Sequence, residues 1–146
     1  MLEKPQQHHA KGQRQALDRL WLRYLADGGE PGRGDVLLTT PGFEQGIRSF
    51  NARAYFDAHE RFELAWRASD YPDRLLPYAL SKLGAACHHA AGSRSRAAPK
   101  LARDALAVLG VLPDFYATID LGAFRRDLAR WLDSPGPTRL ELRRVP

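Results

Sequence analysis

Apolar side chains recur every three or four residues along most of this 146-residue chain, and this spacing restricts its fold more than any other feature. In the segment over residues 11–26, for example, Leu17, Trp21 and Leu25 stand four residues apart. Side chains at that spacing share one face of an α-helix, whereas a half-buried strand alternates at every second residue. The spacing therefore predicts helices that each bury one face.

Glycine and proline residues separate the apolar segments and mark where helices end. Asn51 is a good capping residue between a short helix and a longer one, and Asp120 can cap the last helix. The longer helices that follow the N-terminal one are predicted over residues 53–69, 73–91, 97–109 and 120–132. No series of strands appears, so the predicted fold class is all-α, a single-domain helical bundle of about five helices with antiparallel central helices.

The stretch Asp27–Asp35 contains four glycines and a proline, which is typical of a flexible connection. We therefore predict three parts: an N-terminal helix and linker over residues 1–40 appended to the core, a helical core domain over 41–134, and a C-terminal tail over 135–146. The tail alternates apolar and charged residues and is expected to lie extended on the body. On this division, Trp66 should contribute more to stability than Trp21.

Charge, cysteine content and the lengths of the apolar runs indicate in which compartment the protein works. The chain has 22 Lys and Arg residues against 17 Asp and Glu, and the excess lies in its C-terminal third. Cys87 is the single cysteine, so no intrachain disulfide can form. No apolar run reaches the length of a signal peptide or a membrane span. We expect a soluble, cytoplasmic protein with no membrane partner.

The run from Phe50 to Glu60, continued by Glu63 and Trp66, reads FNARAYFDAHE followed by E and W. It resembles the signature of a family of bacterial and plastid proteins catalogued as domain of unknown function 309, with its FN, YFEAHE and downstream E and W. The likeness extends over about residues 46–109. The resemblance implies an all-helical fold and a family without an established activity, and it includes Arg74 and His88. Pro77 and Ser81 replace glutamines of the family pattern.

The motif places polar groups on an otherwise aromatic helix face. Four residues advance about 400° along an α-helix, so His59 and Glu63 lie only about 40° apart, and Glu60 lies about 60° from Glu63. His88 borders the apolar face of the neighbouring helix. The candidate polar or ligand site therefore comprises His59, Glu60, Glu63, His88 and Arg74, flanked by the core aromatics Tyr55, Phe56 and Trp66.

Three interpretations of this site are open. The favoured one is a structural hydrogen-bonded cluster, in which a histidine satisfies Glu63 and Arg67 or Arg74 neutralises the remaining charge. The alternatives are a metal centre or metalloenzyme using His59, Glu63 and His88, and a pocket for a small ligand. The zinc-protease motif HExxH is absent, because Glu63 stands where its second histidine belongs. The favoured interpretation requires no cofactor.

The C-terminal arginines suggest a second class of function. Arg125, Arg126 and Arg130 are candidate nucleic-acid contacts, and a basic interaction module binding nucleic acid or acidic partners is the alternative function. Acidic residues such as Asp127 and Asp133 are interspersed among them, which favours an ordinary solvated helix surface. The sequence therefore predicts a small helical protein with a His/Glu polar centre and specifies no reaction.

Overall fold

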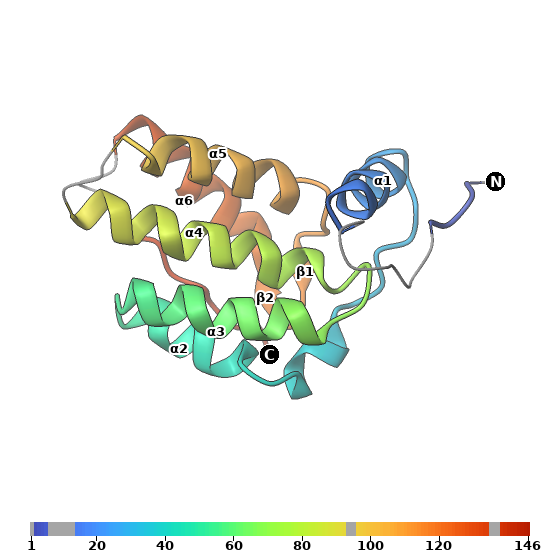
Figure 1. The fold of residues 1–146 in the computed structure, drawn as a ribbon, viewed down its shortest axis with the longest axis horizontal. Helices are drawn as coiled ribbons and strands as arrows, with labels where there is room; N and C mark the ends of the chain where they lie inside the picture. The colour runs from blue at the N-terminus through green and yellow to red at the C-terminus, as the bar shows by residue number, and fades with distance from the viewer. Residues whose placement is uncertain (1, 6–13, 93–95, 135–137) are drawn as a thin grey trace.

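The computed structural model describes residues 2–5, 14–92, 96–134 and 138–146. These residues form a helical bundle with one short hairpin, which confirms the all-α fold class (Figure 1). The elements are α1 (Arg14–Ala26), a 3-10 helix η1 (Asp35–Thr39), α2 (Phe43–Asn51), α3 (Tyr55–Ala68), α4 (Leu75–Ala91), α5 (Ala98–Leu109), β1 (Phe115–Tyr116), β2 (Ile119–Asp120) and α6 (Leu121–Asp133).

Helix α4 lies at the centre of the bundle, with α3 packed on one side and α5 on the other. Ten of its 17 residues are buried, because apolar and small side chains surround almost its whole circumference. Pro77 is tolerated in its first turn, where the missing backbone N–H would have no partner within the helix. Helices α3 and α4 run antiparallel, as predicted, and α2 covers the outer side of α3.

Helix α1 contributes side chains to the same buried cluster as the central helices. Trp21 is completely buried, and its ring stacks on Tyr71 with 5.5 Å between centroids. The division of the chain at residue 40 stays a prediction. The peripheral position that we expected for Trp21 is wrong, because its side chain belongs to the core cluster although it lies near the N-terminus of the sequence.

The hairpin of β1 and β2 was not predicted. Its turn places Ala117 and Thr118 at φ values of 50° and 61°, a left-handed conformation that glycine or asparagine usually signals in a sequence. The end of the chain lies extended against this hairpin through a bridge between Ile119 and Arg144. Residues 135–137, where the predicted tail begins, lie outside the described residues.

Asn51 ties the C-terminal segment to α2. Its side-chain Nδ2 donates to the Leu142 carbonyl at 2.9 Å, and its Oδ1 accepts from the Leu142 N–H at 2.8 Å. Asn51 is the last residue of α2, and α3 begins four residues later without a side-chain cap. The expected capping role of Asn51 is therefore replaced by a contact that spans 91 residues of sequence. Asp120, in contrast, caps α6 as predicted by accepting from the Ala123 N–H.

Candidate functional site on helices α3 and α4

A glycine lets α3 and α4 approach closely beside the polar motif. A Cβ atom built on Gly84 would lie 3.0 Å from the His59 backbone nitrogen and 3.1 Å from the Tyr55 carbonyl oxygen. Because Gly84 has no side chain, the backbone of α4 can lie against the first turns of α3. This approach holds His59 beside Ser81, which lies one turn before Gly84 on α4.

We expect Gly84→Ala to destabilise the protein. The added methyl group meets backbone atoms that cannot move aside, and overpacking of this kind costs about 1 to 3 kcal/mol. The better helix propensity of alanine returns about 1 kcal/mol. Urea unfolding measures the net loss. Gly92→Ala is the control, because the atoms nearest its added Cβ are 3.5 and 4.0 Å away. A more stable Gly84→Ala variant would show that the helices do not need this close contact.

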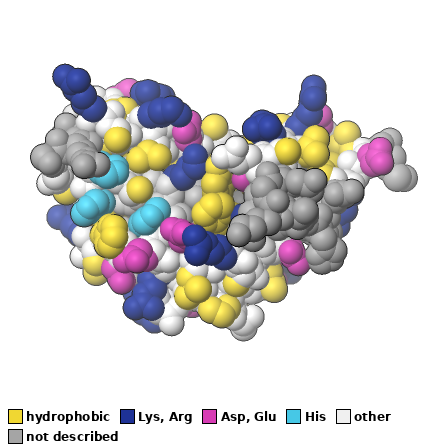
Figure 2. Space-filling model, in the orientation of Figure 1, with side chains coloured by type: hydrophobic (Ala, Val, Ile, Leu, Met, Phe, Trp, Pro, Cys, Tyr) yellow, Lys and Arg dark blue, Asp and Glu magenta, His cyan; other side chains and the backbone are white. Residues whose placement is uncertain are grey.

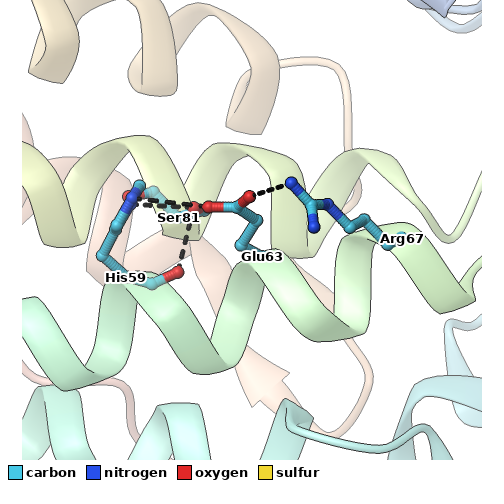
Figure 3. Close-up of polar contacts among 4 residues, drawn as sticks. All are labelled: His59, Glu63, Arg67 and Ser81. Carbon is cyan, nitrogen blue, oxygen red and sulfur yellow. Dashed lines mark hydrogen bonds and ion pairs between the residues drawn. The ribbon is translucent and has the colours of Figure 1, made fainter.

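Ser81 fixes the orientation of the His59 ring. The Nδ1 atom of His59 lies 2.8 Å from the Ser81 carbonyl oxygen and 3.0 Å from the Ser81 hydroxyl (Figure 3). A carbonyl oxygen can only accept, so Nδ1 carries the proton and donates it there. The Ser81 hydroxyl in turn donates to the His59 carbonyl at 3.1 Å. In the neutral ring, Nε2 therefore bears the lone pair and is the atom available for a ligand.

Glu63 faces that available nitrogen. One of its carboxylate oxygens lies 3.6 Å from His59 Nε2, and the other pairs with Arg67 at 2.5 Å (Figure 3). The side chains of His59 and Glu63 are each 30% exposed, so solvent reaches both. The helical spacing predicted this proximity. The structural interpretation also named Arg67 as the neutralising partner, and the ion pair with Glu63 is present.

Serine, histidine and glutamate together resemble the composition of a hydrolytic triad, but their geometry differs. Ser81 is only 4% exposed, and its hydroxyl lies on the Nδ1 side, where the ring nitrogen already donates a proton. A nucleophilic serine needs a substrate-accessible oxygen and a neighbouring nitrogen that accepts its proton. Ser81 therefore orients His59 and is not placed to attack a substrate.

His88 lies apart from the His59–Glu63 pair. Its ring contacts Phe56, with 5.3 Å between centroids, and the Phe56 ring is 6.3 Å from that of His59. Within the described residues, no group of three or more His, Cys, Asp and Glu side chains is placed to hold a metal ion. The predicted ligand set of His59, Glu63 and His88 is therefore not assembled. Glu60 is exposed on the same helix.

Phe56 is exposed rather than buried. Its relative exposure is 54%, so the expectation that it is a core aromatic is wrong, whereas Tyr55 and Trp66 are each partly buried. The position of Phe56 on α3 turns its ring toward His88 and solvent instead of toward the interior. Figure 2 shows three histidine side chains gathered on this face beside hydrophobic and acidic groups. The site is thus an open surface of aromatic, imidazole and carboxylate groups.

Arg74 belongs to a separate buried cluster at the opposite end of the α3–α4 pair. It is 1% exposed, donates to the Trp66 carbonyl at 2.9 Å and stacks over the Trp66 ring at 4.8 Å. Its Nε lies 3.9 Å from Asp18 on α1, which also accepts a hydrogen bond from Tyr71. Burial and Asp18 raise the pKa of Tyr71, which keeps the hydroxyl protonated. Arg74 therefore joins α1 to α4 and does not reach Glu63.

Sequence reasoning missed the role of Asp18. It stands beside Leu17 and three residues before Trp21, so it borders the buried face of α1. A carboxylate in that position requires a partner when the helix packs. The available signal was therefore an acidic residue next to an apolar stripe, but its cationic partner lies 56 residues further along the chain.

Two of the three candidate nucleic-acid contacts are engaged within the protein. Arg125 donates to the carbonyls of Leu109 and Leu112, each at 3.1 Å, and pairs with Asp114. Arg130 pairs with Asp127 at 2.8 Å. Arg126 is exposed. Arg125 thus satisfies carbonyl groups at and beyond the C-terminal end of α5. Because Arg125 and Arg130 both have partners within the protein, the three arginines do not form a uniform phosphate-binding surface.

Cys87 is a buried side chain in the core. Burial raises the pKa of its thiol to about 12, so the group remains a protonated thiol at neutral pH. A reactive cysteine needs thiolate character and access. Cys87 has neither, which agrees with its place in the apolar stripe of α4.

No helix among the described residues has both the length and the apolar character needed to cross a bilayer.

Comparison with known proteins found a family match for the central part of the chain. Residues 43–101 match the model of the family described as Domain of unknown function (DUF309). No curated protein and no solved structure matches the chain. The matched segment begins with α2 and ends in α5, so it includes His59, Glu63 and Ser81. The resemblance found in the motif around His59 is confirmed over these residues, which are similar to that family.

Proposed function

We propose that this protein binds a cationic or hydrogen-bond-donating ligand non-covalently on the α3–α4 face. The observation that carries the proposal is the 2.8 Å contact between His59 Nδ1 and the Ser81 carbonyl, because it leaves Nε2 as an acceptor beside Glu63. Two acceptors 3.6 Å apart, each partly exposed, suit a group with two neighbouring N–H donors. Amidinium and guanidinium groups have that arrangement.

The surroundings support a ligand that combines positive charge with a flat apolar part. The exposed Phe56 ring lies between His59 and His88 and offers a face for stacking or cation–π contact. Arg67 is mostly exposed, so a cationic ligand can displace it from Glu63 without disturbing the core. The cytoplasmic location expected from the sequence stays a prediction.

Titration with benzamidine tests this proposal, and benzamide is the neutral control of the same shape. We expect benzamidine to shift the NMR signals of His59 and Glu63 and benzamide to leave them unchanged. Glu63→Gln should weaken benzamidine binding about tenfold or more, because a charge-assisted hydrogen bond contributes about 1.5 to 3 kcal/mol.

Glu60→Gln is the matched control, since it removes the same charge from the same helix without touching His59. An equal loss of affinity in both variants would show a diffuse acidic surface instead of a defined site. Binding of benzamide as tight as that of benzamidine would also overturn the proposal.

A further inference from the structure

A second concave region lies between α1, α4 and α5, away from the His59 face. It is an open depression of about 440 Å³, enough for a small organic molecule. The lining residues come from all three helices, and Figure 1 places α1 beside the ends of α4 and α5. They are Gln15, Asp18, Arg19, Leu22, Tyr78, Lys82, Asp104, Ala107 and Val108.

Two carboxylates and two cations line this cleft. Asp18 pairs with Arg74, and Asp104 pairs with Lys100 at 3.1 Å, so each carboxylate in the wall has its own cation outside the lining. Lys82 and Arg19 are the cations that line the cleft itself. Because Arg74 and Lys100 offset the two carboxylates from outside the lining, Lys82 and Arg19 can attract an anion.

The cleft also has an apolar side. Leu22, Ala107 and Val108 contribute aliphatic surface, and the Tyr78 ring lies under the Lys82 ammonium at 5.1 Å. The Lys82 nitrogen is 3.8 Å from Asp104, which is longer than a direct hydrogen bond, so its donors remain available to another acceptor. A ligand can thus place an anionic group on Lys82 and an apolar or aromatic part on the opposite wall.

We propose that the cleft between α1, α4 and α5 binds a small organic anion that carries an apolar or aromatic part. Lys82 and Arg19 would hold the anionic group, and Leu22, Tyr78 and Val108 would pack against the remainder. This site is independent of the His59 face and prefers ligands of the opposite charge. Failure of one proposal therefore leaves the other standing.

NMR titration of the full chain with phenyl phosphate tests the proposal, with benzoate as a second anion and phenol as the neutral control. We expect both anions, but not phenol, to shift the amide signals of Leu22, Lys82 and Val108. A stronger response to phenyl phosphate assigns the site to phosphate esters, and a stronger response to benzoate assigns it to carboxylates. Saturating benzamidine should not compete with either anion.

Three variants separate a defined site from general charge attraction. Lys82→Met should weaken phenyl phosphate binding about tenfold or more, because it removes a charged donor. Asp104→Asn should tighten phenyl phosphate binding several-fold, since it releases Lys82 from its acidic neighbour. A misfolded variant would not bind phenyl phosphate more tightly. Arg103→Met removes an exposed charge of α5 that does not line the cleft and should have little effect. Equal losses in Lys82→Met and Arg103→Met, or no tightening in Asp104→Asn, would overturn the proposal.

Discussion

Replacing Trp21 with alanine is expected to lower the free energy of unfolding by about 3 to 5 kcal/mol. The side chain is completely buried, stacks on Tyr71 and meets the Tyr24 ring edge-on at 5.4 Å. Its removal leaves a cavity between α1 and the N-terminal end of α4. Tyr71, which borders this cavity, is held by its hydrogen bond to Asp18 and cannot move in to fill it. Guanidinium unfolding followed by circular dichroism measures the loss.

Trp66→Ala is the natural comparison, because Trp66 is a tryptophan of the central bundle that is only partly buried. We expect a smaller loss for this variant than for Trp21→Ala, which is the reverse of what the sequence pattern suggested. If Trp66→Ala cost more, the contact of α1 with the core would be weaker than its burial indicates.

Breaking the buried pair of Asp18 and Arg74 should be comparably costly. Asp18→Leu removes the carboxylate that faces an arginine with 1% exposure, and an uncompensated buried charge costs about 3 to 5 kcal/mol. The double variant Asp18→Leu, Arg74→Met removes both charges and should recover a large part of that loss, because it leaves no buried ion without its partner.

A double-mutant cycle built from urea unfolding of the four proteins gives the coupling between the two residues. We expect a coupling above about 1 kcal/mol. Additive losses would mean that Asp18 and Arg74 act separately, and the connection between α1 and α4 would then rest on apolar packing alone.

The sequence was most informative where the signal is local. The apolar spacing predicted the central helices, and the i to i+4 relation predicted that His59 and Glu63 lie together. Asp120 caps α6 for the same reason: the capping interaction joins it to Ala123, three residues away. Such contacts depend on helix geometry, which the sequence pattern specifies directly.

Other features depend on which helix faces which, and one sequence does not contain that information. The motif gives Phe56 and Trp66 as aromatic residues of α3, but the position of α4 leaves Phe56 exposed to solvent beside His88. Trp21 looked peripheral because a glycine-rich connection follows it, although the connection is long enough for α1 to fold back. The partnership of Asp18 and Arg74 is hidden for the same reason.

The hydrogen bonds between Asn51 and Leu142 bear on the order in which the chain folds. Ordering a loop of about 90 residues costs about 2 kcal/mol more than ordering one of about ten, so such a contact forms after local ones. The α3–α4 and α4–α5 pairs join neighbouring segments and can assemble early. We infer that docking of the last residues beside α2 is a late step of folding, and that their release is an early step of unfolding.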